Sequence, residues 1–89
     1  MKIKLKSTRL RIDFLTRLTR DPSSIIYLQE YGYDKYTIRD QVSKMIKLGF
    51  IEQDGFEKNF LIDRKLKRYK ITKKGLEYLE KQGILLLRK

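Results

Sequence analysis

The segment from residue 33 to residue 51, YDKYTIRDQVSKMIKLGFI, carries side chains that can bond to the base edges of nucleic acid. The guanidinium of Arg39 can donate two hydrogen bonds to O6 and N7 of one guanine, and Gln41 could pair with adenine if its direction allows. Most of these groups fall in the first two turns of a predicted helix, the part that meets base edges when a helix end enters a groove. The candidate base-reading residues are Lys35, Tyr36, Arg39 and Ser43.

A second group of charged side chains extends from residue 64 to residue 74 and contains no acid. Lysine and arginine in such a block either form a solvated face or neutralise phosphates. Asp40 would repel phosphate unless it bonds to cytosine or pairs with Lys44 one helical turn later. The candidate phosphate-binding residues are Lys44, Arg64, Lys65, Lys67, Arg68 and Lys73. Six such contacts would give log K a slope of roughly −5 against log salt.

The overall charge also favours a polyanionic partner. Lysine and arginine number 22 against 11 acids, so the 89-residue chain has a net charge of +11. A surplus of this size leaves positive potential on the surface, which suits nucleic acid, anionic lipid or an acidic protein. The N-terminal series Lys2, Lys4, Lys6, Arg9 and Arg11 either follows phosphates or only solubilises this end.

Catalysis has little support in the sequence. Histidine and cysteine are absent, which removes thiolate nucleophiles, imidazole bases and Cys/His metal sites. Asp63-Arg64-Lys65 loosely resembles the acid-x-lysine element of some nucleases, but single elements of this kind arise often by chance. The five glycines lie far apart, so no glycine-rich phosphate loop exists. We therefore predict a binding protein with no enzymatic activity, no cofactor and no metal.

The apolar segments are too short to cross a membrane. The longest apolar run covers residues 84–87, and the first ten residues lack the continuous apolar stretch of a secretory signal. We expect a cytoplasmic protein without a membrane partner. The absence of alanine and the single asparagine favour AT-rich coding and a hot environment, which leaves an archaeal or viral origin open.

The length of 89 residues, with no interdomain linker visible in the sequence, predicts one domain over residues 1–89. The alternation KIKLK favours an edge strand or an N-terminal arm. Asp21-Pro22 predicts a helix start, Asp34 caps the next helix, and Asp54-Gly55 predicts a hairpin turn. Residues 56–65 are a second strand, a long tip, or both. The expected elements are an arm or edge strand over 1–6, helices over 8–19, 22–31, 35–48 and 73–82, a hairpin over 50–71, and a tail over 84–89.

The helix over 35–48 has a clear buried side. Ile38, Val42, Met45 and Ile46 recur at helical spacing, and Tyr33 stands where it can pack on Ile38 as a hydrophobic staple. The opposite side is then left to the polar and basic groups.

Residues 9–80 resemble the winged helix-turn-helix domains of bacterial and archaeal transcription regulators, broadly of the MarR-like type. Residues 33–51 are similar to the recognition helix of that family, with its exit at Leu48-Gly49-Phe50-Ile51. Residues 69–80, YKITKKGLEYLE, are similar to the last wing strand and the following helix, joined through Thr72 and Gly75. The resemblance implies an α+β fold, mainly α, with a three-helix core, a β-hairpin wing and a C-terminal helix.

The resemblance also implies a function. The helix over 35–48 would enter the major groove of double-stranded DNA while the wing lies along the backbone or a minor groove. The expected protein is a sequence-specific regulator, as a homodimer on a palindromic site. Two alternatives stay open: an adaptor or accessory subunit that binds a larger replication or transcription protein, and a nonspecific DNA-coating protein. Apolar residues at the margins either pack within the monomer or form a protein interface: Phe56, Phe60, Leu61, Ile62, Leu85 and Leu87.

Overall fold

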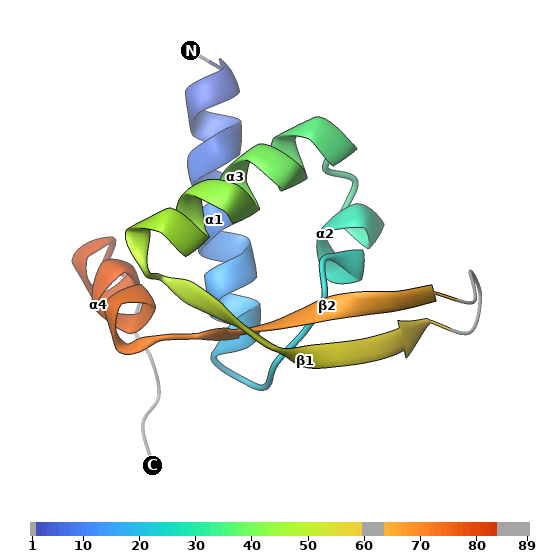
Figure 1. Ribbon diagram of the computed structural model, residues 1–89. Coiled ribbons are helices and arrows are strands. Elements are labelled where there is room, and N and C mark those ends of the chain that lie inside the picture. Colours follow the sequence, from blue (N-terminus) through green and yellow to red (C-terminus); the bar gives the residue numbers. More distant parts are fainter. Residues whose placement is uncertain (1, 60–63, 84–89) are drawn as a thin grey trace.

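The computed structural model describes the backbone of residues 2–59 and 64–83 and the side chains of residues 8–58 and 65–83. This part of the chain forms a small α+β fold, as the sequence predicted, with four helices and one two-stranded antiparallel hairpin (Figure 1). In chain order the elements are α1 (Lys2–Leu18), α2 (Ile26–Glu30), α3 (Lys35–Leu48), β1 (Ile51–Asn59), β2 (Arg64–Ile71) and α4 (Lys73–Lys81).

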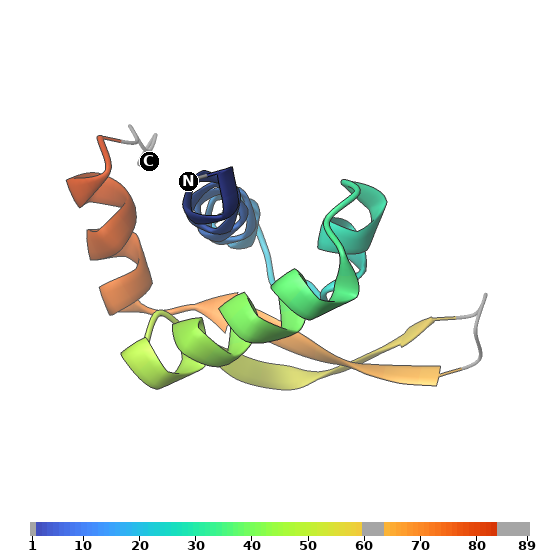
Figure 2. The same ribbon diagram turned by 90° about the horizontal axis from the view of Figure 1, so that it is seen from above.

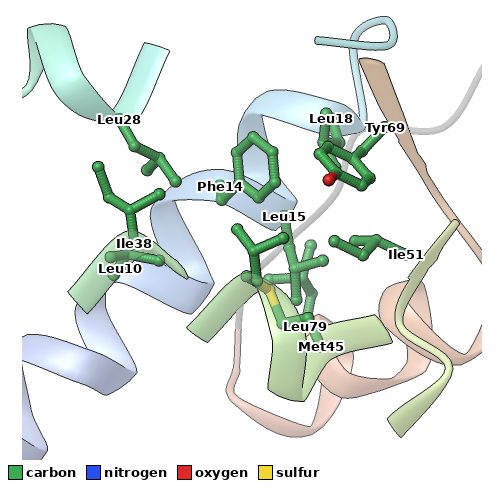
Figure 3. Close-up of a cluster of buried hydrophobic side chains, with 11 residues drawn as sticks. Leu10, Phe14, Leu15, Leu18, Leu28, Ile38, Met45, Ile51, Tyr69 and Leu79 are labelled. Atoms are coloured by element: carbon green, nitrogen blue, oxygen red, sulfur yellow. The ribbon is translucent and has the colours of Figure 1, made fainter. Parts of the chain in front are cut away.

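The hydrophobic core forms around α1, and every described element contributes to it (Figure 3). Phe14 of α1 meets Tyr69 of β2 edge to face, with ring centroids 6.4 Å apart. This contact ties the base of the hairpin to the helices. The buried apolar side chains are Leu10, Phe14, Leu15, Leu18, Leu28, Ile38, Val42, Met45, Ile51, Tyr69 and Leu79.

The first helix begins earlier than the sequence indicated. Residues 2–6, predicted as an arm or edge strand, are part of α1, which starts at Lys2 rather than at residue 8. No glycine or proline interrupts residues 2–18. A helix nucleated by its buried stripe can extend through lysine and leucine, which both favour the helical state. The polar and apolar alternation was therefore a misleading signal.

The second helix is shorter than predicted, covering Ile26–Glu30 instead of 22–31. Asp21-Pro22 does not start it. The backbone of Ser23 exchanges two hydrogen bonds with Tyr69, at 2.8 and 3.0 Å, and so forms an isolated bridge along the free edge of β2. These long-range bonds hold residues 21–25 in a non-helical connection.

The bounds of α3 agree with the prediction, and those of α4 agree to within one residue. Asp34 accepts a hydrogen bond from the Thr37 amide at 2.7 Å, as a helix cap does. Thr72 accepts one from the Gly75 amide at 3.2 Å. A Cβ at position 75 would lie 2.4 Å from the carbonyl oxygen of Phe50, so only glycine fits there. Close packing therefore explains the Thr-x-x-Gly step.

The hairpin does not turn at Asp54-Gly55. Both residues lie inside β1, where Gln53 pairs with Tyr69 but Phe56 pairs with Lys67. Two residues of β1 thus stand opposite the single residue Arg68, which is a β-bulge. Gly55 has a φ of 72°, a left-handed conformation that suits a bulge as well as a turn. The segment 56–65 begins as a continuation of β1 to Asn59.

Candidate nucleic-acid interface

The polar side of α3 is open to solvent. In Figure 2, α3 and the hairpin lie together in the lower part of the view, and α1 lies above them. All four candidate base-reading residues are exposed, Tyr36 by 77% of its surface. Lys35, Arg39 and Ser43 line the same flank of α3, whereas Tyr36 points further around the helix. The structure therefore brings three of the four candidates together.

Two residues of α3 lie on the opposite side from the one the sequence predicted. Gln41 is only 2% exposed, and its Oε1 accepts a hydrogen bond from Arg11 Nε at 2.8 Å. It is therefore a buried polar link between α1 and α3 and cannot reach a base. Ile46, expected in the buried stripe, is 46% exposed and borders the flank that carries Arg39.

The acid on α3 has a cationic partner within the helix. Lys44 Nζ lies 3.3 Å from Asp40 Oδ2, the pairing considered from the sequence. Both side chains are more than half exposed, so the pair adds little to stability. The pair nevertheless offsets the negative charge of Asp40, and it engages Lys44, one of the candidate phosphate-binding residues.

Two surface hollows lie between α3 and the hairpin. One, of about 370 Å³, lies between α3, the start of α2 and β2; Arg39, Ile25 and Tyr69 are among the residues that line it. The other, of about 440 Å³, lies between the end of α3 and the hairpin, with Lys67 on its wall. Ile46 and Tyr69 line both hollows, so the flank of α3 continues onto one face of the hairpin.

The two faces of the hairpin carry different charges. On one face the cations have acidic neighbours: Lys70 Nζ lies 3.8 Å from Glu52, and Arg68 Nε lies 3.9 Å from an Asp54 carboxylate oxygen. Arg68 Nε also donates to the Asp54 carbonyl at 2.9 Å, so this arginine fastens the bulge. Arg68, a candidate phosphate ligand, is thus engaged within the hairpin.

The other face, which we call the lysine face, carries Phe56, Lys58, Lys65 and Lys67. The register places Phe56 opposite Lys67 and Lys58 opposite Lys65, and opposed residues share a face. All three lysines are exposed. None of the ion pairs among the described residues involves Lys65 or Lys67.

The remaining candidates are placed less fully. Lys73 is exposed at the first position of α4. The start of α4 lies beside the end of α3, since the Thr72 amide donates a hydrogen bond to the Phe50 carbonyl. Arg64 pairs with Asn59 through its backbone, and its side chain lies outside the described part. Phe56 is 56% exposed. The other predicted interface residues lie outside the described residues: Phe60, Leu61, Ile62, Leu85 and Leu87.

Sequence reasoning missed two exposed lysines of this region. Lys47 follows Ser43 by one turn of α3 and could have been found from that spacing. Lys58 could not, because its face depends on the bulge.

The tyrosines around the α2–α3 turn, other than Tyr36, are engaged within the protein. Tyr31 stacks with Tyr27 at 5.2 Å and with Tyr33 at 6.4 Å between ring centroids. The Tyr33 hydroxyl donates to Asp13 Oδ2 at 2.6 Å. Burial, and then this bond, raise the pKa of Tyr33 well above its ordinary value of 10.0. Burial likewise raises the pKa of Tyr27 and of Tyr69.

Other kinds of site were sought in residues 2–59 and 64–83. No three acidic, histidine or cysteine side chains there gather as a metal site requires. In the same residues no helix combines the length and apolar character needed to cross a membrane.

Comparison with known proteins supports the fold. No protein-family profile matches the sequence, and no curated protein matches it as a relative. A solved structure from Thermoplasma acidophilum, provisionally described as a transcriptional regulator, is similar with a TM-score of 0.73 and 19% sequence identity. The similarity covers 90% of this chain and 82% of the other. At this identity it shows a shared fold, consistent with the winged helix expected from the sequence.

Proposed function

We propose that this protein binds double-stranded DNA as a sequence-specific transcription regulator of the winged-helix type, within the broad MarR-like class. One observation carries the proposal: the base-bonding flank of α3 lines one hollow, Lys67 of the lysine face lines the other, and the two hollows share Ile46 and Tyr69. The provisional description of the similar Thermoplasma acidophilum structure agrees with it.

In this proposal α3 provides base recognition. Its first turns enter the major groove, where Arg39 can bond to a guanine and Ser43 and Lys35 to neighbouring acceptors. Exposed Ile46 suits contact with a thymine methyl group because it is an apolar residue beside these polar ones. Tyr36, at the outer edge of the same turns, contacts a base or the adjacent backbone.

The hairpin provides affinity. Lys65 and Lys67 neutralise phosphates beside the groove that α3 occupies, and Lys73 does so beside the end of α3. Arg68 has a structural role instead, since it holds the bulge. A homodimer on a palindromic site would present two α3 helices about one helical turn of DNA apart.

The experiment is a mobility-shift titration against a random-sequence duplex pool, with selection of the bound fraction at two salt concentrations. Enrichment of a palindromic motif that Arg39→Ala no longer prefers would support the proposal. Lys81→Ala is the matched control, because it removes one charge at the end of α4 that lies far from the hairpin (Figure 2).

The alternatives predict different results in the same titration. Binding without any enriched sequence indicates a nonspecific DNA-coating protein. No duplex binding near physiological salt refutes DNA binding and favours an adaptor for a larger protein.

A further inference from the structure

The hairpin exposes one large apolar side chain among cations. Phe56 is 56% exposed and lies on the lysine face, directly opposite Lys67 and two residues from Lys58. More than half of the Phe56 surface stays in contact with water in the folded monomer, and lysines around it disfavour an ordinary apolar protein contact. The surroundings of the ring therefore suit an anionic partner that also offers an apolar surface.

The bulge is what puts the ring there. Without the extra residue, regular pairing beyond Gln53 would place Phe56 opposite Leu66, on the face that carries the acids. The bulge shifts the register by one, and a shift of one residue moves each later side chain of β1 to the other face. Phe56 and Lys58 thereby join the lysine face. Glu57 leaves it and accepts a hydrogen bond from Ser24 Oγ at 3.1 Å.

The bulge thereby separates the acids of the hairpin from the lysine face. The described acids of the hairpin, Glu52, Asp54 and Glu57, contact Lys70, Arg68 and Ser24. On the opposite face, beside Phe56, Lys65 and Lys67 take part in none of the ion pairs among the described residues. Proteins that bend DNA present this combination: cations hold the phosphates while an apolar side chain enters the minor groove and partly unstacks a base step.

We propose that Phe56 is an apolar wedge that enters the DNA minor groove and kinks the duplex where the hairpin lies. The inference rests on the proposed DNA binding and adds a mechanical role for the hairpin. A kink also contributes specificity, because pyrimidine–purine steps such as TA deform most easily. The protein then selects such a step at a fixed distance from the bases that α3 reads.

The test measures DNA bending and binding separately. A duplex recovered from the selection is labelled at both ends, and energy transfer between the labels gives its bend. The same duplex with 2-aminopurine at each candidate step reports local unstacking as a rise in fluorescence. Phe56→Ala removes the wedge and Phe56→Leu keeps a smaller one. Leu48→Ala is the control, since Leu48 is a similarly exposed apolar residue at the end of α3.

The wild-type protein should bend the duplex by roughly 20 to 90°. Phe56→Ala should lose most of the bend and the fluorescence rise, keep the salt dependence of binding, and leave α3's base preference intact. Phe56→Leu should retain part of both signals, and Leu48→Ala all of both. A straight duplex in the wild-type complex, or an equal bend with Phe56→Ala, overturns the wedge while DNA binding stands. If Phe56→Ala bends the duplex as much as the wild type does, the Phe56 ring would instead be available to a protein partner. Absence of duplex binding overturns the proposed function itself.

Discussion

The charge difference between the two faces of the hairpin makes a quantitative prediction. The double substitution Lys65→Gln with Lys67→Gln removes two cations from the lysine face. Its control is Lys70→Gln with Lys81→Gln, which removes one cation paired with Glu52 and one at the far end of α4. Both proteins lose two charges from a chain of net charge +11, so any effect of total charge is the same.

The expected size follows from counterion release. Each phosphate neutralised by a cation contributes roughly 0.9 to the slope of log K against log salt. Loss of Lys65 and Lys67 should make the slope shallower by about 1.8. Between roughly 50 and 200 mM salt, wild-type affinity should therefore fall by about 12-fold more than that of the lysine-face variant. The control should keep the wild-type slope, because charges further away than about 8 to 10 Å are largely screened.

Fluorescence anisotropy of one labelled duplex, titrated at four or five salt concentrations, gives the three slopes. Circular dichroism and a thermal melt of each protein verify that the fold is retained. Equal slopes for the two double variants would refute the reasoning, since the lysine face would then have no preferred relation to phosphate. If the slope of log K against log salt becomes as shallow in the control variant as in the lysine-face variant, binding depends only on the total charge of the protein.

Three further predictions concern the fold that supports this face. Gly75→Ala should destabilise the protein by about 1 to 3 kcal/mol, because the new Cβ would overlap the Phe50 carbonyl; a chemical denaturation curve measures this. The raised pKa of Tyr33 contributes stability that is complete below pH 10.0 and is lost as pH rises above it, and Tyr33→Phe should reduce that alkaline loss. At neutral pH the same change should cost about 1.5 kcal/mol through the lost bond to Asp13, measured by thermal melts across pH. Deletion of Gly55 should restore regular pairing, exchange the two faces of the outer hairpin, and weaken duplex binding without loss of helical circular dichroism.

The two substitutions each have a matched control. Lys73→Ala alters an exposed residue of the same helix as Gly75 and should leave stability within about 0.5 kcal/mol. Tyr36→Phe removes the hydroxyl of an exposed tyrosine and should leave the stability at neutral pH within about 0.5 kcal/mol. An unchanged denaturation curve for Gly75→Ala would contradict the packing described above. A loss of stability at alkaline pH as large in Tyr33→Phe as in the wild type would contradict the linkage to the Tyr33 pKa.

The sequence predicted the elements whose ends are set locally. The bounds of α3 could be read because Asp34 caps its start and Gly49 follows its end. Those of α4 followed in the same way from Thr72. The starts of α1 and α2 depend on distant contacts: the core around Phe14 for α1, and the bridge between Ser23 and Tyr69 for the segment before α2.

The candidate site was predicted only in part, for a related reason. Period-two alternation separates Lys65 and Lys67 from Arg68 once β2 is assumed, and helical spacing groups Arg39 with Ser43. No local pattern shows that Gln41 is buried against Arg11, because that bond joins two helices. Asp54-Gly55 is equally suited to a turn and to a bulge, since both need a left-handed glycine.

The position of the acids, more than the number of lysines, decides where a polyanion would bind. Lysine and arginine are spread over every described helix but α2 and over both strands, so their surplus alone marks no face. On the hairpin, Glu52 and Asp54 compensate the cations of one side, and the bulge moves Glu57 to that side as well. Because a field weakens where opposite charges alternate, we expect the described residues to give the most positive potential beside Lys65 and Lys67, next to α3. A one-residue insertion in a strand thus sets the orientation in which the whole domain would approach DNA.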